Sequence, residues 1–239
     1  LRSLVGSEMC IRDRLGLDFD AVNVQCVLSD GRGGLIGETI LPIESPIKPE
    51  TITARLLEAS HYVLKHFQGK RRLLTFGIAC SSPVGWDNKV HFLESSGWLE
   101  CDLDILDDIE KALGLPGIID NDANMGAYAE LRLNASSGEK DIGYILIHRG
   151  VGAGIISEGK IFRGHANMAG EFGHIVIDPD GPRCSCGRFG CLESLASIPC
   201  LIDYVIEAVK FGYPTTLADL EKESLTVTKI VDAGLAGDK

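Results

Sequence analysis

The spacing of apolar residues along the chain predicts both strands and helices. Alternating apolar and polar positions, and short wholly apolar runs bounded by turn residues, indicate strands. The predicted strands span 21–28, 35–41, 73–80, 117–120, 142–147, 151–156 and 160–162. Glycine-containing turns separate the first two of these and the last two, which predicts two β-hairpins.

Other stretches carry apolar residues at every third or fourth position, the spacing of one helix face. Leu56, Ala59 and Val63 are such a face. One predicted helix begins at Thr51. Further helices are predicted over 103–113, 123–133 and 201–211, with one or two more within 217–234. Strands and helices interleave without a repeat of fixed period, which predicts an α/β fold.

Composition narrows the class of protein. The 239 residues are 45% hydrophobic with a formal charge of −11, which suits one large domain or two lobes and disfavours direct binding of nucleic acid by this segment. No apolar run is long enough to span a bilayer, and no signal peptide is evident. The scattered cysteines fit a reducing compartment, so we expect a cytoplasmic protein without a membrane partner.

Both ends of the chain differ from those of a complete protein. It begins with Leu1, and residues 1–14 resemble translated sequencing-adaptor read-through, so we expect them not to be native; a polar N-terminal arm is the alternative. Residues 233–239 stop within a helical pattern, which predicts C-terminal truncation. Two lobes are expected, with a seam after Asp120 that divides 15–120 from 121–239.

Three cysteines and one histidine form a candidate metal site. Cys184, Cys186 and Cys191 fall within eight residues, and His174 precedes them by ten positions. Thiolates and imidazoles are the ligands of tetrahedral zinc, and four of them leave no open position, so we expect a structural zinc loop. Gly187 and Gly190 are expected to allow the tight turns that such a loop needs. Buried free cysteines are the alternative.

Polar residues flank this cluster and follow one predicted strand. Asn121 and Asp122 stand where a strand ends and a helix begins, a common place for ligands in α/β sheets. Asp122 is either a general base for a substrate hydroxyl, with an asparagine holding a neighbouring hydroxyl, or a helix cap. Glu171 and Glu193 bracket the metal cluster and are not needed as ligands.

A glycine-rich turn runs from His148 to Gly154. Such turns allow backbone N–H groups to approach a phosphate or a sugar, although they are common between strands. Arg149 and Arg163 are either anion-binding residues or ordinary solvated side chains.

Together these motifs resemble the ROK family, which groups bacterial sugar-responsive repressors with sugar kinases. The resemblance rests on 121–124, 170–174 and 184–193 and implies an actin-like, ribonuclease-H-like fold of two lobes with a sugar or sugar phosphate between them. It implies that His174, Cys184, Cys186 and Cys191 bind zinc. The implied sugar-binding residues are Asn121, Asp122, Glu171, His174 and Glu193. One ring nitrogen of His174 can bind the metal while the other reaches the ligand.

Two loops decide between kinase and sensor. Family kinases carry Asp-x-Gly-x-Thr in the first hairpin, where this chain has Asp18-Phe-Asp20-Ala-Val22 and thus a carboxylate where a polyphosphate must approach. Their second phosphate loop reads Gly-Thr-Gly, where this chain has His148-Arg149-Gly150, followed by Gly152. Both phosphate loops are therefore altered.

These differences favour the sugar-binding effector domain of a transcriptional regulator. The resemblance implies a homodimer in which a winged helix, which precedes the sugar domain in such regulators, contacts DNA. The alternative is an ATP-dependent kinase of the glucokinase or N-acetylhexosamine kinase type, with Asp122 as general base and Mg-ATP as donor. A third hypothesis is a zinc-stabilised domain without a ligand.

Overall fold

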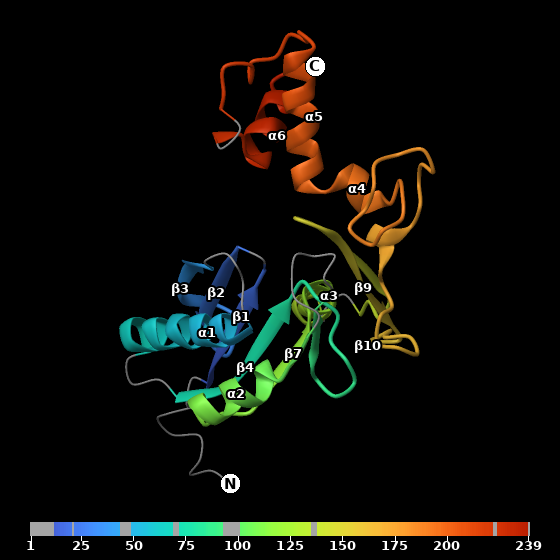
Figure 1. Ribbon diagram of the computed structural model, residues 1–239. Coiled ribbons are helices and arrows are strands. Elements are labelled where there is room, and N and C mark those ends of the chain that lie inside the picture. Colours follow the sequence, from blue (N-terminus) through green and yellow to red (C-terminus); the bar gives the residue numbers. More distant parts are fainter. Residues whose placement is uncertain are drawn as a thin grey trace, which may run out of the picture. The chain divides into compact units, whose positions relative to one another are not determined.

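The chain forms two compact units that are joined by three passages of the backbone. The computed structural model describes residues 12–20, 22–43, 49–68, 72–92, 101–134, 138–221 and 224–238 (Figure 1). Unit 1 comprises Leu1–Ile142 and Gly154–Ala169, and unit 2 comprises Gly143–Ala153 and Gly170–Lys239. The predicted seam after Asp120 does not coincide with this division, because the helix that follows it contacts the sheet of unit 1.

Unit 1 is built on a five-stranded mixed sheet with the order β3-β2-β1-β4-β7. The strands are β1 (Arg12–Phe19), β2 (Asn23–Ser29), β3 (Leu35–Pro42), β4 (Arg72–Cys80) and β7 (Gly117–Asn121). β1 pairs antiparallel with β2 and parallel with β4, and β4 pairs parallel with β7. The carboxyl ends of three parallel strands therefore meet at one edge of the sheet.

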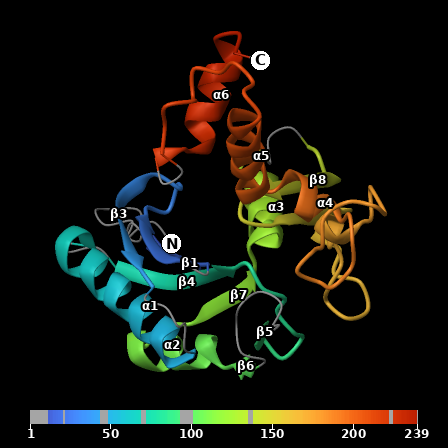
Figure 2. The same cartoon turned by 45° about the horizontal axis from the view of Figure 1, so that its top comes forward.

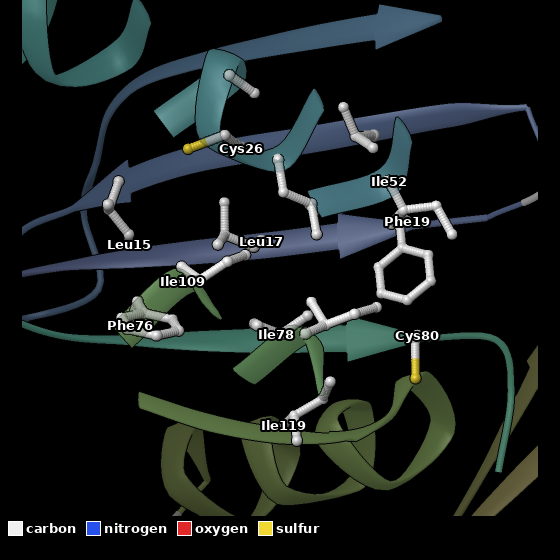
Figure 3. Close-up of a cluster of buried hydrophobic side chains, with 14 of the residues drawn as sticks. Leu15, Leu17, Phe19, Cys26, Ile52, Phe76, Ile78, Cys80, Ile109 and Ile119 are labelled. Carbon is white, nitrogen blue, oxygen red and sulfur yellow. The ribbon is translucent and has the colours of Figure 1, made fainter. Parts of the chain in front are cut away.

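The core of unit 1 lies between this sheet and two helices. In register across four strands, Cys26, Leu17, Ile78 and Ile119 form one buried row (Figure 3). The helices α1 (Pro49–Val63) and α2 (Ile105–Leu113) bury residues such as Ile52 and Ile109 in the same cluster. A π-helical turn, η1 (Leu64–Gln68), extends α1, and α3 (Asp122–Leu133) contacts β4 and β7.

The central strand β1 was not among the predicted strands. Leu15, Leu17 and Phe19 are almost fully buried, and the residues between them are half-buried, so the alternation was present in the sequence. Residues 12–14, which we set aside above, form the beginning of this strand, and Asp13 is buried. Residues 1–11 lie outside the described part of the chain.

A second sheet of three strands has the order β10-β9-β8. Its strands are β8 (Ile142–Ile147), β9 (Val151–Ser157) and β10 (Lys160–Ile161), all of which were predicted. The division between the units runs through β8 and β9, and β10 belongs to unit 1. Unit 2 also contains a 3-10 turn, η4 (Phe172–His174), and the helices α4 (Leu192–Ala196), α5 (Ile198–Lys210) and α6 (Val227–Leu235). Figure 2 shows α4 beside a loop of little regular structure, which holds the cysteines.

A sheet of two short strands follows β4. β5 (Val90–Phe92) pairs antiparallel with β6 (Cys101–Leu103), and residues 93–100 lie outside the described ranges. Among the described residues, no helix has the length and apolar character needed to cross a membrane.

Candidate functional site

The junction between β7 and α3 places Asn121 and Asp122 at the carboxyl edge of the first sheet. Asn121 is the N-cap of α3, because its Oδ1 accepts hydrogen bonds from the amides of Ala123 (3.0 Å) and Asn124 (3.4 Å). Its Nδ2 donates to the carbonyl of Cys80, the last residue of β4, at 3.4 Å. Asn121 rather than Asp122 therefore caps the helix, and the cap hypothesis for Asp122 is wrong.

The Asp122 carboxyl group lies at the first position of the helix. Its Oδ1 accepts from the amide of Ala123 at 2.7 Å. Burial raises the pKa of Asp122 to about 6, and the nearby charge of Asp18 adds to that effect against the opposing amide hydrogen bond. A carboxylate with a pKa near neutrality is suited to accept a proton from a hydroxyl.

The hairpin between β1 and β2 is organised by Asp20. Its Oδ1 accepts hydrogen bonds from the amides of Val22 (2.6 Å) and Asn23 (2.7 Å), and its own amide donates to the carbonyl of Asn23. An aspartate that folds back on the following amides in this way is an Asx turn. The amides of Val22 and Asn23 are thus already bonded to a carboxylate; Ala21 lies outside the described ranges.

In unit 2, the carboxylate of Glu193 holds the loop that follows β8. Its Oε2 accepts from the amide of Val151 at 3.1 Å, and its Oε1 accepts from the hydroxyl of Ser185 at 3.1 Å. A Cβ atom at Gly150 would lie 2.6 Å from that Oε2, so an alanine at this position would displace the Glu193 carboxylate. Arg149 is exposed in this loop, and Gly152 lies in β9.

The four predicted metal ligands come together in unit 2. One donor atom from each of His174, Cys184, Cys186 and Cys191 lies within 4.8 Å of all the others. The Cys186 and Cys191 sulfurs are 3.7 Å apart, and the Cys184 sulfur is 3.6 Å from Nδ1 of His174. A zinc tetrahedron with usual bond lengths has edges of about 3.8 Å between sulfurs and about 3.6 Å between sulfur and nitrogen. The donor set and spacing therefore fit zinc.

Two glycines permit the turns of this loop. Gly187 and Gly190 have φ angles of 88° and 64°, in the left-handed region, as their positions in the sequence predicted. A Cβ at Gly190 would also overlap the carbonyl oxygen of Asp178. The amide of Gly187 donates to the carbonyl of Cys184, which closes a tight turn between the first two cysteines.

His174 directs its two ring nitrogens at different groups. Nδ1 faces the Cys184 sulfur, and Nε2 lies 3.8 Å from a carboxylate oxygen of Glu171. Partial burial raises the pKa of Glu171, while the facing His174 lowers it and Glu193 raises it again. The Glu171 side chain is still 44% exposed, so its carboxylate remains accessible to a ligand.

One functional contact was missed by the sequence reasoning. The Arg163 side chain is 29% exposed, and its charge is already matched by a carboxylate, because its Nη2 pairs with Oδ2 of Asp120 at 2.5 Å. The Asp120 side chain is only 7% exposed. The two residues are 43 positions apart, so no local spacing could have revealed the pair.

The predicted sugar-binding residues fall into two groups. Asn121 and Asp122 belong to unit 1, at the β7–α3 junction, whereas Glu171, His174 and Glu193 belong to unit 2, around the cysteine cluster. The phosphate-loop equivalents divide in the same way: Asp18 and Asp20 lie in unit 1, and Arg149, Gly150 and Gly152 lie in unit 2.

Known relatives include both regulators and kinases. The xylose repressor of Bacillus subtilis (strain 168) is 32% identical over 189 residues, which cover 79% of this chain and 48% of the repressor. The glucokinase of Halalkalibacterium halodurans is 30% identical over 229 residues, which cover 94% of this chain and 69% of the kinase. This chain thus spans about half the length of the xylose repressor.

Solved structures divide between the same two classes. A ROK family transcriptional regulator, a homologue of the Escherichia coli MLC protein, superposes with a TM-score of 0.80 at 29% identity and covers 95% of this chain and 56% of its own. A ROK family glucokinase from Streptomyces griseus, in complex with glucose and AMPPNP, superposes with a TM-score of 0.80 at 27% identity. The match covers 95% of this chain and 72% of the glucokinase chain. The model of the ROK family matches residues 15–236. The chain therefore belongs to the ROK family and has the actin-like α/β fold of that family's regulators and kinases.

Proposed function

We propose that this chain is the sugar-binding effector domain of a ROK-type transcriptional regulator. The observation that carries the proposal is the Asx turn of Asp20, whose carboxylate accepts from the amides of Val22 and Asn23. A nucleotide phosphate at this hairpin would lose those two donors and meet a negative charge at close range. The hairpin is therefore suited to hold its own shape rather than a polyphosphate.

The second altered loop supports the same conclusion. The amide of Val151 is bonded to Glu193 rather than directed at a ligand, and His148 and Arg149 stand where the kinase pattern has glycine and threonine. The Glu193 carboxylate also adds negative charge beside the loop. In each of the two altered loops, a carboxylate of this chain thus accepts hydrogen bonds from backbone amides.

The proposed ligand is a sugar or sugar phosphate. Asn121, Asp122, Glu171, His174 and Glu193 supply carboxylates, an amide and an imidazole, which suit the donors and acceptors of sugar hydroxyls. The glucokinase from Streptomyces griseus, which is similar in fold, was solved in complex with glucose and AMPPNP. In the full-length regulator, a winged helix that precedes this domain contacts DNA, and the protein acts as a homodimer whose sugar-bound state shifts DNA affinity.

We further propose that the four-residue cluster binds a structural zinc ion. The fit of the 3.6 and 3.7 Å contacts to a zinc tetrahedron supports this assignment. The ion would fix a loop that has little regular structure of its own. With Nδ1 of His174 on the metal, Nε2 remains available on the side of Glu171.

A coupled ADP-release assay tests the proposal against the kinase alternative. The full-length protein is assayed with a panel of hexoses, N-acetylhexosamines and pentoses, and binding of the same sugars is measured by calorimetry. We expect binding of at least one sugar with ADP release at background. Robust sugar-dependent ADP release would contradict the regulator proposal.

A sugar kinase is the second candidate, favoured by the raised pKa of Asp122 and by the glucokinase relatives. In that reaction the Asp122 carboxylate accepts the proton of a sugar hydroxyl. The hydroxyl oxygen then forms a bond to the γ-phosphorus of Mg-ATP as the bond to ADP breaks. Asp122→Asn would abolish turnover in a kinase, whereas in a regulator it only weakens sugar affinity.

A further inference from the structure

We infer that Arg163 and Asn167 are positioning residues for the proposed sugar-binding pair Asn121–Asp122, acting through the buried carboxylate of Asp120. The inference rests on the proposed sugar site. All of these residues belong to unit 1, although Arg163 and Asn167 come from the segment that follows β10, far from the β7–α3 junction in sequence.

Asp120 is the point at which the contacts converge. One carboxylate oxygen, Oδ1, accepts from the amide of Asn121 (2.8 Å) and from Nδ2 of Asn124 (3.0 Å). The other, Oδ2, accepts from Nη2 of Arg163 at 2.5 Å. Asp120 therefore orients the first turn of α3 from inside, and Arg163 supplies the positive charge that its buried carboxylate needs.

Asn167 fixes the guanidinium from the opposite side. Its Oδ1 accepts from Nη1 of Arg163 at 3.2 Å, and its Nδ2 donates to the carbonyl of Val84 at 2.5 Å. Asn167 is 8% exposed and has a φ angle of 58°, a left-handed conformation that asparagine tolerates better than most residues. Arg163 thus has its two terminal nitrogens bonded to two buried side chains.

A further bond joins the same two loops at the surface. The indole Nε1 of Trp86 donates to the carbonyl of His165 at 3.1 Å. Val84 and Trp86 belong to the loop after β4. The last residue of β4, Cys80, accepts a hydrogen bond from the side chain of Asn121 through its carbonyl. The loops after β4 and β10 are therefore tied to the β7–α3 junction through Arg163 and Asn167, where the proposed sugar ligands Asn121 and Asp122 stand.

An exposed arginine–carboxylate pair elsewhere in unit 1 shows how the Arg163–Asp120 pair differs from an ordinary ion pair. In the Arg55–Glu58 pair on α1 the arginine side chain is exposed to a similar degree (26%, against 29% for Arg163), but the Glu58 side chain is 57% exposed. Removal of Arg55 leaves a solvated carboxylate, whereas removal of Arg163 leaves a buried one that also holds Asn121 and Asn124. Arg55→Met is thus the matched control for Arg163→Met.

Hydrogen exchange on the 239-residue chain tests the inference without reference to any sugar. In Arg163→Met we expect amide exchange over 121–124 to accelerate on the order of tenfold, because the first turn of α3 loses its anchor. Exchange over 184–191 in unit 2 should be unchanged, and Arg55→Met should resemble wild type throughout. Wild-type exchange over 121–124 in Arg163→Met would overturn the inference.

Sugar affinity provides the second readout. With the sugar that wild type binds in calorimetry, Arg163→Met should weaken binding on the order of tenfold, and combination with Asn121→Ala should add little. Full additivity of the two substitutions would contradict a role through Asn121. If wild type binds no sugar in the panel, the proposed function fails, and the exchange measurement still decides the positioning role.

Two milder variants keep the test decisive if Arg163→Met does not fold. Arg163→Lys keeps the charge but cannot bond Asp120 and Asn167 as a fork, and Asn167→Gly keeps the left-handed backbone without the side chain. Each variant should accelerate amide exchange over 121–124 about threefold and leave amide exchange over 184–191 unchanged. Wild-type exchange in both would overturn the inference.

Discussion

The two units position their carboxylates by different physical means. In unit 1, Asp120 and Asp122 stand at the end of the sheet strand β7 and the start of a capped helix, where backbone bonds and an ion pair fix them. In unit 2, Glu171 and Glu193 flank a loop whose regular structure is limited to short turns, and the cysteine–histidine cluster takes the place of a core. A site of the first kind should survive loss of metal, and a site of the second kind should not.

The largest expected effect is the removal of one metal ligand. Cys191→Ser should release the ion and unfold the loop from 174 to 191, since structural zinc supplies about 10 kcal/mol or more in small zinc domains. We expect sugar binding to be abolished, with zinc at about one per chain in wild type and absent in the variant by elemental analysis. Hydrogen exchange should accelerate in this loop while 72–80 in unit 1 stays protected.

Cys200→Ser is the matched control. Cys200 lies on α5 outside the cluster, where its sulfur accepts from the hydroxyl of Ser197. The Cys200→Ser variant should keep the zinc content and the sugar affinity of wild type. Zinc-free wild type, purified without chelator, with an ordered loop would contradict the metal assignment.

The substitution Asp122→Asn tests how the carboxylate at the start of α3 in unit 1 makes stability depend on pH. Because the pKa of Asp122 is raised to about 6 in the folded state, wild type loses stability as pH rises from about 4 to about 6, and the loss persists above that. The neutral asparagine removes this penalty, so the variant should be more stable by up to about 3 kcal/mol at pH 7 and no more stable at pH 3.5. Urea unfolding at both pH values measures the difference.

Asp87→Asn, which alters an exposed carboxylate in the loop after β4, should shift stability by less than about 0.5 kcal/mol at either pH. A gain for Asp122→Asn that is equal at pH 3.5 and pH 7 would show that desolvation of the charge is not its cause.

Gly150→Ala probes the link between Glu193 and the loop after β8. The added Cβ would lie 2.6 Å from Oε2 of Glu193, so the carboxylate must move from the Val151 amide. We expect a loss of about 1–2 kcal/mol in stability and weaker sugar binding. Gly143→Ala, at a position with open space around the Cβ, should be close to neutral; equal effects of the two variants would argue against the contact.

The smallest expected effect is at the first hairpin. Asp20→Ala removes the acceptor for the amides of Val22 and Asn23 and should cost about 1 kcal/mol, whereas Asp20→Asn retains an oxygen acceptor and should cost less. Thermal unfolding of the two variants measures the difference. Equal losses would indicate that the carboxylate charge, rather than the Asx turn, stabilises the hairpin.

The sequence was sufficient for features that depend on local spacing. Cys184, Cys186 and Cys191 are close in sequence, so their meeting with His174 could be predicted, as could the positive φ of Gly187 and Gly190. Most strands and helices followed from their periodicity.

Features that depend on distant partners could not be predicted. The role of Arg163 depends on Asp120, which is 43 positions away, and the cap at α3 depends on which of two neighbouring polar side chains turns back onto the helix. The strand β1 was missed for a different reason: its first residues, 12–14, belong to the segment that we had set aside, although its alternation was readable.

Titration of the full-length protein with AMPPNP, in the presence and absence of a bound sugar, tests the central claim most directly. Because Asp20 and Glu193 occupy the backbone donors of both altered phosphate loops, we expect the sugar to bind and the nucleotide to give no saturable heat in either condition. Saturable nucleotide binding that strengthens when the sugar is present would contradict the regulator account and establish the protein as a kinase candidate.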